Sequence, residues 1–197
     1  MIYRTITISL AILTAFSLAA CQGGKEKEAE TRPDVALTEG ADTMAIAVTS
    51  PAFEDGGMIP KKYTCDGEDI APPLHIDGVP GEARSLVLIA DDPDAPSKTW
   101  VHWVLYNLPP GTTELPENMP KDEEIQSGAR HGITDFQRFG YGGPCPPSGT
   151  HRYYFKVYAL DTMLDLSGKV TKTDVLKAME GHVLAEGQLM GRYQRQR

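Results

Sequence analysis

Residues 140–161 determine the fold prediction: Gly140-Tyr-Gly-Gly-Pro-Cys-Pro-Pro-Ser-Gly-Thr-His-Arg-Tyr-Tyr-Phe-Lys-Val-Tyr-Ala-Leu-Asp161. The first half is rich in glycine and proline, which build constrained loops, and the second half is rich in aromatic residues, which favour strands. Residues 90–96 (Ala-Asp-Asp-Pro-Asp-Ala-Pro) and 100–103 (Trp-Val-His-Trp) show the same arrangement of a constrained turn and an apolar strand with one polar residue. We expect the three stretches to meet at one small pocket.

Strand alternation selects the candidate pocket residues. The rows that share a strand face are Leu86, Leu88, Ala90 and Asp92; Trp100, His102, Val104 and Tyr106; and His151, Tyr153, Phe155, Val157 and Ala159. Each row is mainly apolar and carries an ionisable residue: Asp92, His102 or His151. Because a buried polar group without partners costs free energy, three such groups are best explained if they contact each other or a ligand. Taken singly, each histidine is more typical of a satisfied core residue, and Asp92 of a turn.

The remaining pattern predicts a mainly β domain with one helix near its end. Residues 85–90 are apolar on both faces, which is typical of a central strand, and residues 109–150 are mostly loop. Residues 174–190 contain helix formers, with apolar side chains near a spacing of 3.6 residues, so they predict an amphipathic helix that packs on the sheet. Thr171 and Asp174 have the spacing of a capping box.

The N-terminal region predicts export. Residues 1–20 have a short basic start and an apolar stretch at 6–16, shorter than the about 20 residues that a spanning helix needs. Leu18-Ala19-Ala20-Cys21 resembles a bacterial lipobox, in which the cysteine receives acyl chains such as palmitate; the alternative is an ordinary signal peptide with a chance cysteine. We therefore expect a signal peptide at 1–20, a lipidated Cys21 with a charged tether to residue 43, and a folded domain at 44–197. The expected location is the bacterial cell envelope, on the outer membrane facing the periplasm.

Charge and cysteine content restrict the partners and predict a disulfide. The chain has a formal net charge of −8 and no basic run, which argues against nucleic-acid binding. If Cys21 carries lipid, Cys65 and Cys145 remain as a pair in an oxidising compartment, where a disulfide is expected. Two free buried thiols are the alternative.

Several motifs together resemble the phosphatidylethanolamine-binding protein family, in its bacterial branch, which is also called Raf-kinase-inhibitor-like. The resemblance covers residues 45–193. The motifs are Tyr-Thr-Cys-Asp-Gly at 63–67, Asp-Pro-Asp-Ala-Pro at 92–96, His-Trp at 102–103, Gly-Gly-Pro-Cys-Pro-Pro at 142–147, Gly-Thr-His-Arg-Tyr at 149–153 and Ala-Met-Glu-Gly-His-Val-Leu-Ala at 178–185.

This resemblance implies a β-sandwich-like fold with a small anion-binding pocket. Carried over by position, the pocket residues are Asp92, Trp100, His102, Gly143, Pro146, His151 and Tyr153. The histidines and the tyrosine hydroxyl can donate to phosphate oxygens, and a glycine lets backbone N–H groups approach closely. The implied ligands are phosphate and phospholipid head groups, and the family includes inhibitors of proteases and kinases. Neither a cofactor nor a metal is implied.

We therefore expect a non-catalytic anion-binding protein. The alternative is a metal-dependent enzyme that uses Asp92, His102 and His151 as a facial triad, or a general acid–base pair. A purely structural pocket is a third hypothesis, and a homodimer is left open. The sequence contains neither a Gly-x-Ser-x-Gly elbow nor a His-Glu-x-x-His motif.

Overall fold

The computed structural model describes residues 44–195. The predicted signal peptide, the lipidated Cys21 and the tether lie outside the described residues. Within 44–195, no helix is both long enough and apolar enough to cross a membrane.

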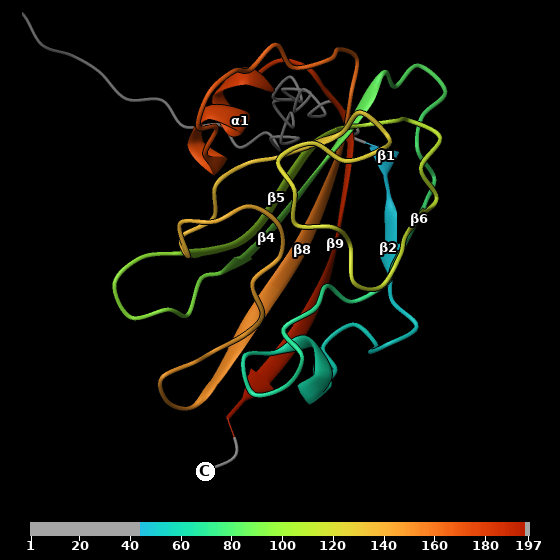
Figure 1. The fold of residues 1–197 in the computed structure, drawn as a ribbon. Coiled ribbons are helices and arrows are strands. Elements are labelled where there is room, and N and C mark those ends of the chain that lie inside the picture. Colours follow the sequence, from blue (N-terminus) through green and yellow to red (C-terminus); the bar gives the residue numbers. More distant parts are fainter. Residues whose placement is uncertain (1–43, 196–197) are drawn as a thin grey trace, which may run out of the picture. The chain divides into compact units, whose positions relative to one another are not determined.

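The described residues form two β-sheets and two short helices. The larger sheet contains, in spatial order, β1 (Met44–Ala45), β9 (Val183–Gln194), β8 (Thr150–Leu160), β4 (Ser85–Asp92), β5 (Trp100–Leu108) and β7 (Arg130–His131). The smaller sheet contains β2 (Ala47–Thr49), β3 (Leu74–Asp77) and β6 (Glu114–Leu115). The helices are the 3-10 helix η1 (Lys61–Tyr63) and α1 (Lys172–Ala178). The predicted mainly β fold with one C-terminal α-helix is confirmed (Figure 1).

Strand β4 lies in the middle of the larger sheet, and all of its residues are buried. Leu86, Leu88 and Ala90 face the core between the two sheets, whereas Val87 and Ile89 face a second core beneath α1. This two-sided burial explains why the sequence is apolar at successive positions rather than at alternate ones. The prediction of a central strand at 85–90 is confirmed.

The predicted helix at 174–190 is wrong in extent. Helix α1 ends at Ala178, Gly181 follows with a φ of +78°, and β9 then pairs antiparallel with β8 along nearly its whole length. The capping box of Thr171 and Asp174 is present, and α1 packs on the sheet through buried apolar residues. Sheet pairing overrides the local helix preference here, because helices in proteins depend on tertiary packing for most of their stability and the pairing with β8 extends from Val183 to Gln194.

A bulge in β5 corrects the predicted row of Trp100, His102, Val104 and Tyr106. Ala90 pairs with Trp103 and Asp91 pairs with Val101, so His102 is an extra residue opposite β4. After the bulge the alternation is shifted: Val104 and Tyr106 face the core beneath α1. Trp100 and His102 therefore do not share a face with Val104 and Tyr106, although the sequence alone predicted that they would.

The sheet order brings the three predicted stretches together. Strand β4 runs antiparallel to both of its neighbours, so its last residues lie beside the first residues of β5 and β8. Asp92 is opposite Trp100, and Asp91 is opposite Tyr154. The end of one strand and the starts of two others thus form one edge of the domain, where the loops before and after them meet.

Candidate functional site

A cavity of about 370 Å³, here called the His–Asp pocket, lies at this edge. Five predicted residues line it: Asp92, Trp100, His102, Pro146 and His151. Sequence reasoning missed the other lining residues, which are Ala95, Pro96, Ser97, Phe136, Cys145 and Pro147. The walls are mostly apolar and rich in proline, and the ionisable groups in the lining are one carboxylate and two imidazoles.

Asp92 holds His151 in a fixed orientation. The Nδ1 atom of His151 lies 2.7 Å from Oδ2 of Asp92, and both side chains are buried. The other carboxylate oxygen accepts the backbone N–H of Asp94 at 2.8 Å. Both oxygens of Asp92 are therefore engaged, and the Nε2 edge of the His151 ring is left to the pocket.

His102 is fixed by a reciprocal contact with the loop before β8. Its Nδ1 atom lies 2.7 Å from the carbonyl oxygen of Gly142, whose N–H donates to the carbonyl of His102 at 2.9 Å. The ring also packs edge-on against Phe136 and Tyr153, with centroid distances of 5.3 and 5.2 Å. Burial lowers the pKa of His102, partly opposed by its hydrogen bond to Gly142, so its neutral form is favoured.

Tyr153 lies behind the pocket rather than in its lining. The residue is buried, and its hydroxyl has no hydrogen-bond partner among residues 44–195. Burial, reinforced by the negative charge of Asp92, raises the pKa of the phenol well above 10, so the hydroxyl keeps its hydrogen. Its ring contact with His102 makes Tyr153 a support for the pocket.

Gly143 also lies outside the lining, and its N–H is not available to an anion. That N–H donates to Oδ1 of Asp69 at 2.6 Å. A Cβ atom at position 143 would lie 2.6 Å from the carbonyl oxygen of Tyr63 and 2.7 Å from Cα of Thr64. Gly143 is therefore required for close packing of two backbone segments, not for the close approach of a ligand that we expected.

Asp69 organises the wall behind the pocket and was missed by the sequence analysis. Besides accepting from Gly143, its carboxylate accepts from Arg138 at 2.7 Å, and its carbonyl accepts from Lys121 at 2.8 Å. The guanidinium of Arg138 lies 5.4 Å from the ring centre of Phe136, which lines the pocket. Asp69 has a φ of +56° and lies in a loop, where no periodicity marks it in the sequence.

A disulfide joins the same two segments. Cys65 and Cys145 are bonded, with a Cα–Cα distance of 5.4 Å, as the cysteine count predicted. Cys65 N–H also donates to the carbonyl of Pro144 at 3.1 Å. Because Cys145 lines the pocket, the bond ties one wall to the turn that follows η1.

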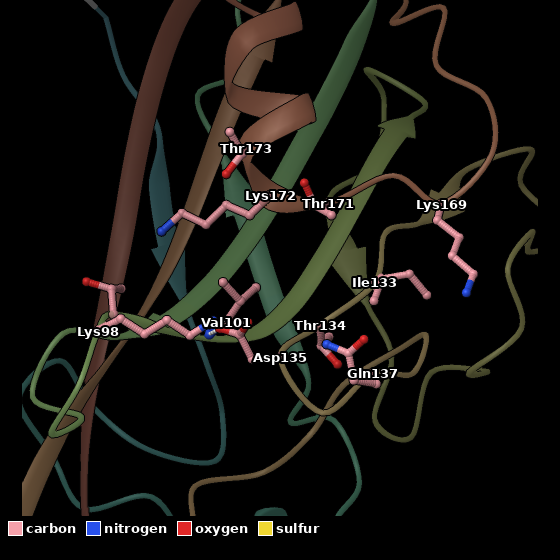
Figure 2. A pocket seen from close by; sticks show the side chains of 11 residues that line it. Lys98, Val101, Ile133, Thr134, Asp135, Gln137, Lys169, Thr171, Lys172 and Thr173 are labelled. Carbon is pink, nitrogen blue, oxygen red and sulfur yellow. Dashed lines mark hydrogen bonds and ion pairs between the residues drawn. The ribbon is translucent and has the colours of Figure 1, made fainter.

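A second cavity of about 390 Å³, here called the lysine cleft, is lined by Lys98, Lys169, Lys172 and Asp135 together with several threonines (Figure 2). None of the predicted site residues lines it. Lys98 pairs with Asp135 at 2.6 Å, and Lys172 pairs with the buried Asp91. Since carboxylates already neutralise two of these lysines, we consider the His–Asp pocket the better candidate site.

The pocket residues do not fit a facial metal triad. Among the described residues, no three histidine, cysteine, aspartate or glutamate side chains are placed to hold a metal ion. Asp92 contacts Nδ1 of His151, so it orients that ring instead of facing the same point as both Nε2 atoms.

The chain is thus a two-sheet β-domain with a histidine–aspartate pocket at one edge of the larger sheet. The family model described as phosphatidylethanolamine-binding protein matches residues 49–194. The chain therefore belongs to the phosphatidylethanolamine-binding protein family.

Relatives and solved structures agree with this assignment. A UPF0098 protein of Methanothermobacter thermautotrophicus is 60% identical over 144 residues, which cover 73% of this chain and 95% of the relative. A structure described as a phosphatidylethanolamine-binding protein homologue from Chlamydia trachomatis is 45% identical, with a TM-score of 0.71, over 77% of this chain and 99% of the other. E. coli YbcL, described as a new member of the mammalian family, is 30% identical with the same TM-score and coverage.

Proposed function

We propose that the His–Asp pocket binds a small phosphate-bearing ligand and that the protein acts by binding rather than by catalysis. The observation that carries the proposal is the convergence of His102 and His151 on one cavity, each with Nδ1 fixed by the protein. Two imidazoles whose remaining nitrogens face one small space suit a tetrahedral oxyanion, because the oxygens can contact both rings at once.

The apolar walls suit the organic part of a phosphate ester. Trp100 and Phe136 pack at a centroid distance of 5.6 Å, and Pro96, Pro146 and Pro147 extend the apolar surface. A ligand with a carbon chain or a head group beside its phosphate can bury that part against these side chains. A free inorganic ion would leave this surface exposed to water.

Calorimetry with phosphoethanolamine at pH 6 tests the proposal. His102→Ala and His151→Ala should each weaken binding at least about tenfold, because each removes a partner of the buried anion. His182→Ala is a suitable control, since His182 is exposed and pairs with Asp161. Unchanged affinity in both pocket variants would overturn the site assignment.

We further propose that Cys21 anchors the domain to the bacterial envelope and that the pocket serves there to bind a phosphate-bearing ligand or to regulate a protein partner such as a protease or kinase. The lipobox-like sequence before Cys21 supports the anchor. Acyl chains contribute about 0.8 kcal/mol per buried CH₂, so several of them keep a protein on a membrane.

A further inference from the structure

Both pocket histidines use their Nδ1 hydrogens inside the protein. The carbonyl of Gly142 can only accept, so Nδ1 of His102 must carry a hydrogen to make its bond. The carboxylate of Asp92 likewise takes the Nδ1 hydrogen of His151. Within residues 44–195, the hydrogen bonds found for the two rings are those of Nδ1, which leaves both Nε2 atoms to the pocket that the rings line. In each neutral imidazole, the nitrogen left to the pocket is therefore a lone pair.

The rest of the lining supplies few donors. Pro96, Pro146 and Pro147 have no backbone N–H, and within the described lining there is neither a lysine nor an arginine. The other side-chain donors in the lining are the hydroxyl of Ser97, an exposed residue, and the indole N–H of Trp100, a half-buried one. With both imidazoles neutral, the buried polar groups of the pocket are thus two Nε2 lone pairs and the carboxylate of Asp92. These groups repel an anion that has no hydrogen to donate to them.

The charged groups around the rings do not change this balance. The carboxylates of Asp91, Asp92 and Asp135 act on His102, and those of Asp92 and Asp94 lie near His151. The phenol ring of Tyr153 packs against His102, and Tyr193 is opposite His151 in the pairing of β8 with β9. Asp91 pairs with Lys156 and Lys172, Asp94 with Arg152, and Asp135 with Lys98. Asp92 is therefore the one carboxylate of this group without a lysine or arginine partner in residues 44–195.

We propose that the pocket selects phosphate monoesters over phosphodiesters, because the ligand must bring a hydrogen that donates to Nε2 of His102. This inference rests on the proposed function and specifies its ligand class. A monoester monoanion has one P–OH group that can donate to Nε2 of His102, and its P–O⁻ oxygens can accept from the other side-chain donors of the lining, Ser97 and Trp100. A diester has no P–OH group, so its oxygens face the lone pair of His102.

The proton balance follows from the chemistry of the ligand. A phosphate monoester loses its second proton near pH 6, so the free ligand at pH 8 is a dianion. Forming the P–OH contact to His102 then takes up at least one proton from solvent for each ligand bound. At pH 5 the ligand already carries that hydrogen, and the uptake falls by about one proton.

The test compares phosphoethanolamine with glycerophosphoethanolamine, a monoester and a diester with the same amine. Calorimetry at pH 8 in buffers of different ionisation enthalpy measures affinity and proton uptake together. We expect the monoester to bind at least about tenfold more tightly than the diester, since the diester leaves the lone pair of His102 facing an anion. The number of protons taken up when the monoester binds at pH 8 should exceed the number taken up at pH 5 by about one.

Two variants separate this inference from a structural effect. His102→Gln supplies an amide N–H that can donate to a diester. In this variant, the ratio of the monoester affinity to the diester affinity should therefore fall toward one. His131→Gln is the matched control, because His131 is equally buried and contacts the Asp122 carbonyl through Nδ1, outside the pocket. Equal affinity for the two esters in the wild-type protein overturns the inference and leaves the proposed function standing. If neither ester binds to the wild-type protein, both this inference and the proposed function are overturned.

Discussion

Gly143→Ala is the sharpest test of how the pocket wall is built. The new methyl group would lie 2.6 Å from the carbonyl oxygen of Tyr63, 2.7 Å from Cα of Thr64 and 2.9 Å from Oδ1 of Asp69. Two of these atoms are backbone, so no side-chain rotation relieves the contact. Overpacking costs about 1–3 kcal/mol, and moving the loop instead breaks the hydrogen bond from the Gly143 N–H to the Asp69 carboxylate. We expect a loss of about 2–4 kcal/mol in the free energy of unfolding.

Thermal and urea unfolding measure this loss. A change of about 3 kcal/mol corresponds to a fall in Tm of roughly 6–12 °C for a domain of this size. Gly111→Ala is the control, because no heavy atom lies within 4 Å of the place its methyl group would take, and the change should stay within about 0.5 kcal/mol. The cost of Gly143→Ala should be smaller when Cys65 and Cys145 are both serine, since the two segments can then separate. A variant with wild-type Tm that no longer binds phosphate would refute the packing role and favour direct contact with the anion.

Three further predictions concern stability and location. Replacing Cys65 and Cys145 by serine should lower the free energy of unfolding by up to about 4 kcal/mol, because the bond closes a loop with a sequence separation of 80; equal urea midpoints for the variant and the oxidised wild type would contradict this. Burial lowers the pKa of His102 and His131 below 6.5, so the unfolded chain binds more protons as the pH falls below about 6.5 and stability should drop between pH 7.5 and 5.5, with a shallower drop in His131→Gln. Cys21→Ser should move the protein from the membrane to the soluble fraction of its host, and membrane retention in that variant would count against the lipid anchor.

The sequence was sufficient for those features that depend on local pattern. The two-sided apolar run of β4 marks a central strand wherever it occurs, because both faces must be covered. The alternation from His151 to Ala159 along β8 likewise places its apolar row toward the core, since the strand is regular there. Proline and glycine beside these strands marked the loops that line the pocket, and the cysteine count was sufficient to predict the disulfide.

The tertiary structure decided the features that depend on distant partners. Pairing with β8 made residues 183–194 a strand despite their helix formers, and the bulge at His102 turned that side chain to the pocket while Val104 turned to the other core. Asp69, far from the pocket in sequence, reaches Gly143 only because the chain folds back along the disulfide. The sequence by itself therefore determined which residue types gather at the pocket. Only the tertiary contacts decided which of their atoms are used internally and which are left for a ligand, because each hydrogen bond needs a partner that local sequence does not identify.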